Sequence, residues 1–175
     1  MLEDACDKTC GVKNVGHGNS CLIADDCLYG TRLVDSFDDE VLSLQPDLIL
    51  VGIGRNDLCH LPTELLVVGY QDLRARAGAA GVPIRFATIT PVNGSWPYPC
   101  EEQRVEVNDW LRTLPGTIDM ETRVSTPAGL LRSAYDYQDG LHFNARGYEA
   151  MGRFALRTVR ADLARIVARK ASTRN

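Results

Sequence analysis

Two short polar blocks contain the residue types that acyl-transfer chemistry needs. Asp139 lies three residues before His142, so within a turn its carboxylate can accept a hydrogen bond from the imidazole ring. Such a pair makes a general base, because the carboxylate fixes the ring tautomer and stabilises the imidazolium that forms. Asn56 lies far upstream, and its side-chain amide is a suitable donor to the negative charge that develops on an ester carbonyl oxygen. Together these residues predict chemistry on carboxylic esters.

Each block also has a purely structural interpretation. Asp139 could cap a helix ahead of a surface histidine, and Asn56 with Asp57 could form only a turn after a strand. In either case we expect Asp57 to hold its loop by accepting hydrogen bonds from backbone N–H groups. The other two histidines of the chain have no carboxylate at a useful spacing, so His142 is the candidate base.

Alternating strand-like and helix-like segments are expected to position these blocks. Residues 48–53 are apolar throughout and end at Gly54, which predicts a buried strand. The other predicted strands cover residues 12–15, 84–90 and 117–120. Helical spacing of apolar residues predicts helices over residues 32–44, 64–80, 102–113 and 145–170.

This alternation predicts an α/β fold with a parallel sheet that is covered on both faces. Residues 1–175 form one domain, with a poorly defined N-terminal segment over 1–11 and a C-terminal helical region over 145–170. Parallel sheets place functional residues in the loops at the carboxyl ends of their strands. The loops over residues 54–59 and 93–100 are therefore expected to open onto the same edge.

Composition excludes several classes of function. The formal charge is −4, and the basic residues of 153–170 alternate with apolar ones at helical spacing, which indicates a solvated helix face rather than a nucleic-acid or membrane surface. No apolar run is long enough for a membrane span. The N-terminus carries acids and lacks the apolar core of a secretory signal, which predicts a cytoplasmic protein as written, or a secreted one if the native N-terminus is missing. The oligomeric state is not predicted.

Six cysteines lie within the first 100 residues. The spacings of Cys6 with Cys10 and of Cys21 with Cys27 do not fit a zinc site, so no metal is expected. Disulfides and reduced, buried thiols both remain open. The pair to test first is Cys59 with Cys100, since both follow predicted strands and should lie at one end of the sheet.

In its two polar blocks and in the predicted elements that carry them, the chain resembles the SGNH (GDSL) hydrolase superfamily of esterases and lipases. The residues that match are the Gly-x-Asn-Asp block over 54–57 and the Asp-x-x-His block over 139–142, with Gly147 and Tyr148 behind it. Residues 87–91 and the helix with Arg104, Asn108 and Trp110 are similar to the family's pattern as well.

The resemblance implies a three-layer α/β/α fold with a parallel, flavodoxin-like sheet, a small-molecule ester substrate and no cofactor. It assigns His142 as the base, Asp139 as its partner and Asn56 to the oxyanion hole. A backbone N–H in the block over residues 14–20 is expected to be the second oxyanion donor, with Gly18 as the candidate and Gly16 behind it.

The chain departs from the family at the nucleophile, because no apolar strand ending in Gly-Asp-Ser precedes Asn14. In one interpretation residues 12–20 are the family's second block, and the first strand with its serine is missing. In the other, Ser20 ends a degenerate Gly-Asp-Ser block and is the nucleophile, with Tyr29 to Thr31 as the following block. The first is favoured, because about ten residues between Ser20 and Gly30 cannot hold a helix and a strand.

A missing first strand has consequences for stability and activity. It would leave unpaired backbone edges and an uncovered face of the core. Either a partner segment covers them or the chain is poorly stable. We expect weak or absent turnover of a short p-nitrophenyl ester. The alternatives are a non-catalytic SGNH-like domain that retains the pocket, and an unrelated flavodoxin-like binding domain, although no Gly-rich phosphate loop follows a strand.

Overall fold

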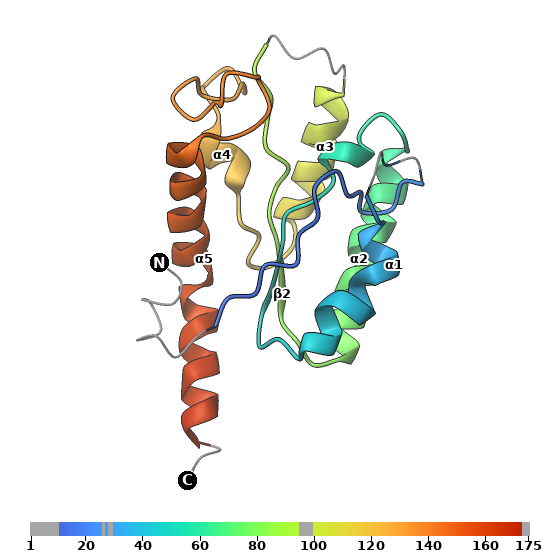
Figure 1. Ribbon diagram of the computed structural model, residues 1–175, viewed down its shortest axis with the longest axis vertical. Coiled ribbons are helices and arrows are strands. Elements are labelled where there is room, and N and C mark those ends of the chain that lie inside the picture. The colour runs from blue at the N-terminus through green and yellow to red at the C-terminus, as the bar shows by residue number, and fades with distance from the viewer. Residues whose placement is uncertain (1–10, 26, 28–29, 95–99, 173–175) are drawn as a thin grey trace.

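The computed structural model of the chain describes residues 11–25, 27, 30–94 and 100–172. A short parallel sheet lies between two layers of helices (Figure 1). Its strands are β1 (Ile49–Val51) and β2 (Ile84–Phe86). A single parallel bridge between Ala87 and Ile118 extends the sheet by one position. The predicted α/β architecture with a parallel sheet is therefore confirmed.

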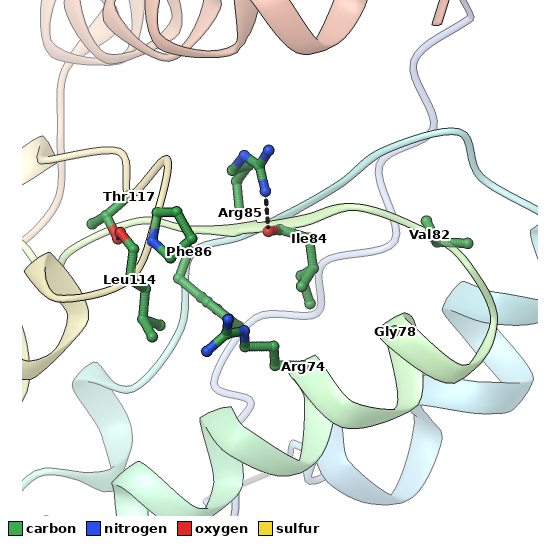
Figure 2. Close-up of a pocket in the computed structure, with 9 residues that line it drawn as sticks. Arg74, Gly78, Val82, Ile84, Arg85, Phe86, Leu114 and Thr117 are labelled. Atoms are coloured by element: carbon green, nitrogen blue, oxygen red, sulfur yellow. Dashed lines mark hydrogen bonds between the residues drawn. The ribbon is translucent and has the colours of Figure 1, made fainter. Parts of the chain in front are cut away.

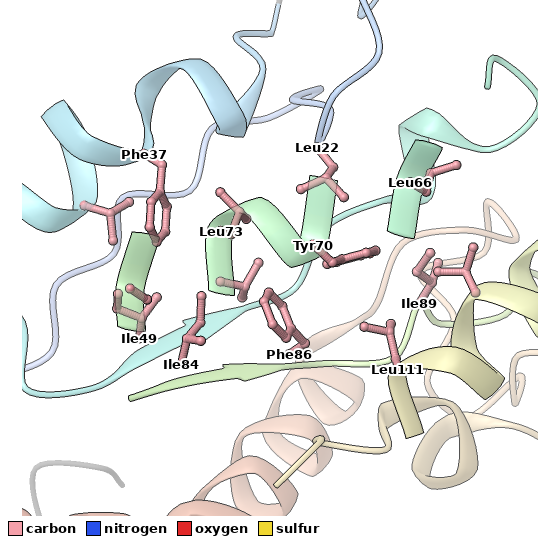
Figure 3. Close-up of a cluster of buried hydrophobic side chains, with 14 of the residues drawn as sticks. Leu22, Phe37, Ile49, Leu66, Tyr70, Leu73, Ile84, Phe86, Ile89 and Leu111 are labelled. Atoms are coloured by element: carbon pink, nitrogen blue, oxygen red, sulfur yellow. The ribbon is translucent and has the colours of Figure 1, made fainter. Parts of the chain in front are cut away.

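One face of the sheet packs against helices α1 (Leu33–Ser36), α2 (Thr63–Ala79) and α3 (Glu101–Arg112). Figure 3 shows the core on this face, where α2 lays Leu66, Tyr70 and Leu73 over the strands. These three side chains are fully buried and recur at the spacing of helix turns, which is why the segment folds as a helix on an apolar surface.

The opposite face packs against α4 (Met120–Val124) and α5 (Ala145–Ser172). A separate core cluster joins them to the sheet, with Ile118, Met120, Ala155 and Val159 as its buried members. Arg85 on β2 also forms a bidentate ion pair with Asp162 on α5, at 2.8 and 2.9 Å. In Figure 1, α5 lies on one side of the sheet and α1 to α3 lie on the other.

The segment predicted as one helix over residues 32–44 is helical, but its type of helix changes along its length. α1 is followed by a π-helical segment, η2 (Phe37–Val41), and by a 3-10 segment, η3 (Leu42–Leu44). Phe37 and Val41 are both buried in the main core. The stretch ends at Gln45, whose left-handed φ of 51° terminates the winding ahead of Pro46.

Two predicted strands are not formed in the described chain. Residues 12–15 run without strand pairing and are largely exposed, and residues 117–120 contribute only the bridge at Ile118. β1 is also shorter than predicted, and Leu50 in its centre is 39% exposed. Among the described residues, no backbone hydrogen bond joins residues 11–18 to β1. One edge and one face of β1 are therefore open. Its residues alternate between buried and exposed, whereas the sequence predicted a strand that is buried throughout.

Two disulfides connect loops to the body of the fold. Cys59 pairs with Cys100, which was the pair to test first, and Cys21 pairs with Cys27, so the thiols at these four positions are not reduced. The first joins the loop after β1 to the start of α3. All four cysteines in the described part of the chain are paired. Cys6 and Cys10 lie outside the described residues, as does Tyr29.

Candidate active site

The turn over residues 139–142 is built around the carboxylate of Asp139. Its Oδ1 accepts hydrogen bonds from the backbone N–H groups of Leu141 and His142, at 2.9 and 2.8 Å. Its Oδ2 lies 2.6 Å from Nδ1 of His142. An ionised carboxylate only accepts hydrogen bonds, so Nδ1 carries the ring proton and Nε2 is left as the free base.

The same contacts set the charge of Asp139. The backbone N–H groups of Leu141 and His142, followed by the imidazole of His142, lower the pKa of Asp139 from 3.8 to about 2. The carboxylate is therefore ionised at neutral pH. The His142 side chain is 65% exposed, so its Nε2 edge is open to a substrate.

The loop after β1 carries Asn56 and Asp57 on a single 3-10 turn, η4 (Arg55–Asp57). Asp57 is fully buried, and its carboxylate accepts from the backbone N–H groups of Leu22, Ile23 and Ala24 at 2.8 to 3.0 Å. The expected role of Asp57 in holding its loop is confirmed by these contacts. The loop after β1 is thereby tied to residues 22–24.

Asn56 is exposed in the middle of this turn. Its Nδ2 donates to the carbonyl oxygen of Ser20 at 3.0 Å, which fixes the side-chain amide. An amide nitrogen carries two N–H groups, so one remains to meet a substrate oxygen. Gly54 starts the turn with a φ of 112°, and a Cβ there would collide with the Tyr70 hydroxyl. The conformation of the turn therefore requires glycine.

Ser20 and Gly18 lie on the segment that approaches Asn56. The Ser20 hydroxyl is buried and has no hydrogen-bond partner among the described residues, so it is not bonded to His142. A Cβ built on Gly18 would meet no atom within 4 Å, so the backbone there faces open space. Gly30 packs directly on the backbone of Asn19 and Ser20.

One polar block follows the carboxyl end of a paired strand, and the other is bound to the segment that follows its neighbour. η4 follows β1, and the 139–142 turn is bound to the segment after β2 through the Asn93 N–H, which donates to the Gly140 carbonyl at 2.8 Å. A cavity of about 410 Å³ lies between β1 and residues 13–17, and Ser20 and Asn56 are among its lining residues. This edge holds the candidate site.

A second hollow of about 200 Å³ lies at the other end of the strands. Figure 2 shows Arg74 on α2, Arg85 on β2 and Thr117 around it. Arg85 donates to the carbonyl of its neighbour Ile84 here, at 3.0 Å. No residue of the two polar blocks lines this hollow.

Three residues of the site were not predicted from the sequence. Arg55 is partly buried and pairs with Glu101 at 2.9 Å, and burial lowers its pKa. Asp136 and Asn93 bond to each other at 2.6 Å beneath the 139–142 turn. An aspartate two residues before a Gln-Asp-Gly turn is a signal for local side-chain capping, which could have identified Asp136.

The described residues contain no group of three or more His, Cys, Asp or Glu side chains that could hold a metal ion. Among the helices that the structure describes, none has both the length and the apolar composition for crossing a bilayer.

Comparison with protein families gives a match over residues 11–150 to the GDSL-like lipase/acylhydrolase family. The chain belongs to this family. The two polar blocks of this GDSL-like protein both lie within the matched residues. A comparison with curated proteins found no match.

Solved structures share the fold at low sequence identity. A protein named as a G-D-S-L family lipolytic protein from Desulfitobacterium hafniense is 18% identical with a TM-score of 0.65, over 74% of this chain and 78% of that one. A lipase/acylhydrolase from Enterococcus faecalis is 19% identical with a TM-score of 0.60, over 75% and 73%. An acetylxylan esterase from Geobacillus stearothermophilus, in a catalytic mutant, is 17% identical with a TM-score of 0.54, over 74% and 69%. These likenesses establish that the GDSL-like fold is shared.

Proposed function

We propose that this GDSL-like protein is an SGNH-type hydrolase of small-molecule carboxylic esters. The observation that carries the proposal is the 2.6 Å contact between His142 Nδ1 and Asp139 Oδ2, on a side chain whose other ring edge is exposed. His142 is the general base, and Asp139 orients it and stabilises its charged form. Membership of the acylhydrolase family supports the same chemistry.

Asn56 and Gly18 are proposed as the donors of the oxyanion hole. When an oxygen nucleophile attacks the ester carbonyl, the carbonyl oxygen becomes negative and needs N–H donors. Asn56 is fixed by Ser20 and retains one N–H for this oxygen. The backbone N–H of Gly18, where a Cβ would meet no atom within 4 Å, is proposed as the second donor. The nucleophile's proton moves to Nε2 of His142 and then to the leaving alcohol.

We propose that Ser20 is not the nucleophile, because its buried hydroxyl has no hydrogen bond to a base that would activate it. In this chain, water would attack the ester with His142 as its base. Sites that lack one member of a triad retain about 10³–10⁴-fold catalysis over water. We therefore expect slow turnover.

The test is hydrolysis of p-nitrophenyl acetate by the wild-type chain and by Ser20→Ala. The expected result is slow release of p-nitrophenol at the same rate in both proteins. Urea unfolding of both proteins serves as the control for an altered fold. Fast turnover that is lost in Ser20→Ala would identify Ser20 as the nucleophile and overturn this account of the site.

A non-catalytic SGNH-like binding domain is the second candidate. The unpartnered Ser20 hydroxyl beside a retained cavity is the observation that favours it. It predicts that p-nitrophenyl acetate gives a saturable shift of the Asn56 amide signals in NMR spectra without release of p-nitrophenol. Hydrolysis above the buffer rate would exclude this candidate.

The two disulfides support an oxidising compartment as the place where the chain folds. Thiol labelling before and after reduction tests this in protein taken from its host. The expected result is that Cys21, Cys27, Cys59 and Cys100 are labelled only after reduction.

A further inference from the structure

Asp136 has a carboxylate that is buried directly beneath the 139–142 turn. The residue is only 9% exposed, and both oxygens are used. Oδ1 accepts from the backbone N–H groups of Gln138 and Gly140, at 2.9 and 3.0 Å, and Oδ2 accepts from Asn93 Nδ2 at 2.6 Å. A carboxylate that accepts from several N–H groups binds each of them strongly, because each such hydrogen bond is charge-assisted.

The backbone that Asp136 holds is in an unfavourable conformation. Gln138 has a φ of 78° and Gly140 a φ of 83°, both in the left-handed region. That region is uncommon for a side chain such as glutamine and persists only when contacts hold it in place. The two N–H groups that Oδ1 accepts belong to these same two residues. Asp136 therefore stabilises the bend that brings Asp139 to His142.

Asn93 connects this bend to the sheet. It lies in the segment after β2, its backbone N–H donates to the Gly140 carbonyl at 2.8 Å, and its side chain donates to Asp136. A Cβ on Gly140 would collide with the Asn93 side chain, so the two residues are in close contact. The turn is thus bound both to the Asp136 carboxylate and to the segment that follows β2.

We propose that Asp136 and Asn93 are positioning residues that together fix the Asp139–His142 pair in its orientation and keep the proton of His142 on Nδ1. Within the described part of the chain, both residues bond to the backbone of the turn and not to the His142 ring, so they act through the backbone that places Asp139. The inference rests on the proposed role of His142 as a base, but the geometry that it concerns can be measured without any ester hydrolysis.

The test combines removal of the carboxylate with an exchange of the two side chains. Asp136→Ala removes the acceptor for Gln138, Gly140 and Asn93. Asn93→Asp places two carboxylates against each other, and Asp136→Asn added to it restores one donor and one acceptor. Two properties are measured by NMR: the ring tautomer of His142, at a pH above the ordinary titration range of histidine, and the exchange rate of the Gly140 amide.

In Asp136→Ala we expect Gly140 exchange to be about 10- to 100-fold faster, from the loss of a hydrogen bond to a charged group. The His142 proton should move from Nδ1 toward the mixture found in a free side chain. Asn93→Asp should behave in the same way, and the double variant Asn93→Asp, Asp136→Asn should return both properties toward wild type. The double variant keeps the test informative where Asp136→Ala does not fold.

Asp162→Asn is the matched control, because Asp162 is similarly buried but bonds to Arg85, away from the turn. It should lower overall stability and leave the His142 tautomer unchanged. An unchanged tautomer and Gly140 exchange rate in a folded Asp136→Ala would overturn the inference, as would failure of Asp136→Asn to repair Asn93→Asp. If these spectra behave as expected while no ester is hydrolysed, the proposed function fails and the positioning role stands.

Discussion

Asp57 and Asp139 show how position decides the role of a carboxylate. Both accept hydrogen bonds from backbone N–H groups, Asp57 from a distant segment over residues 22–24 and Asp139 from its own turn. Asp57 is fully buried, and its carboxylate accepts from backbone N–H groups in the described part of the chain, so its role is structural. Asp139 lies at the surface and uses its second oxygen for His142, so its charge is available to an acid–base reaction.

The charge of Asp139 gives a pH prediction. Its pKa is lowered from 3.8 to about 2 by backbone and imidazole donors, so the ionised form stabilises the folded turn. This stabilisation is complete above the ordinary aspartate range of about 3.9 and is lost as the pH falls through about 2. Carbon-13 NMR titration of the Asp139 carboxyl group should therefore give a midpoint near 2. A midpoint equal to that in the urea-unfolded chain would contradict the hydrogen bonds described here.

The contact of Asp139 with His142 could be predicted from the sequence because the two residues are three positions apart, within the reach of one turn. The support from Asn93 could not, because it lies 43 residues from Asp136 and joins it only after the sheet has formed. Neither residue type is unusual in a loop. Local spacing in the sequence therefore identified the Asp139–His142 pair, but not the residues that support the turn beneath it.

The helices were predicted more closely than the strands. α2, α3 and α5 begin and end within one or two residues of the predicted positions. Their hydrogen bonds are local, so the apolar period that buries one face also specifies the element. A strand ends where its neighbour ends, so the apolar run over 48–53 did not determine the bounds of β1. The same reason applies to residues 12–15, which have no described partner.

The two disulfides should differ in their contribution to stability. Cys59 and Cys100 are 41 residues apart, and Cys21 and Cys27 are six apart. The entropy of loop closure in the unfolded chain predicts a loss of about 4 kcal/mol when the first pair is replaced by serines and about 2 kcal/mol for the second. Urea unfolding at equilibrium measures both.

The Cys21→Ser, Cys27→Ser variant serves as the reference for the longer disulfide, since both double substitutions exchange the same atoms. Equal losses would mean that the two links act through contacts in the folded state rather than through the unfolded chain.

At the scale of the whole molecule, the three layers are complete except around β1. Leu50 is 39% exposed in the middle of this strand, whereas Val51 is 7% exposed against the main core. A cavity of about 290 Å³ lies beside Leu50 on the α5 face, with Met151 and Ala155 on its far side. Among the residues that the structure describes, the sheet has two strands and the other edge of β1 is unpaired, which fits an SGNH sheet that lacks a strand.

The open face gives a stability prediction. Leu50→Lys should cost less than about 1 kcal/mol, because its ammonium group can reach water. Val51→Lys should cost more than about 4 kcal/mol, since it buries a charge in the core. The free energy of unfolding in urea distinguishes them. If the two variants lose the same large amount, the face of β1 next to α5 is covered in solution.

The most direct test of the central claim is the hydrolysis of p-nitrophenyl acetate by His142→Ala. His60→Ala is the control, because His60 is also exposed but is not among the residues that line the cavity beside Asn56. A general base contributes about 10²–10⁴ in rate, so we predict that His142→Ala loses at least about 100-fold of the catalysed rate. His60→Ala should keep the wild-type rate. Equal rates in wild type and His142→Ala would contradict the assignment of the Asp139–His142 pair as the acid–base centre.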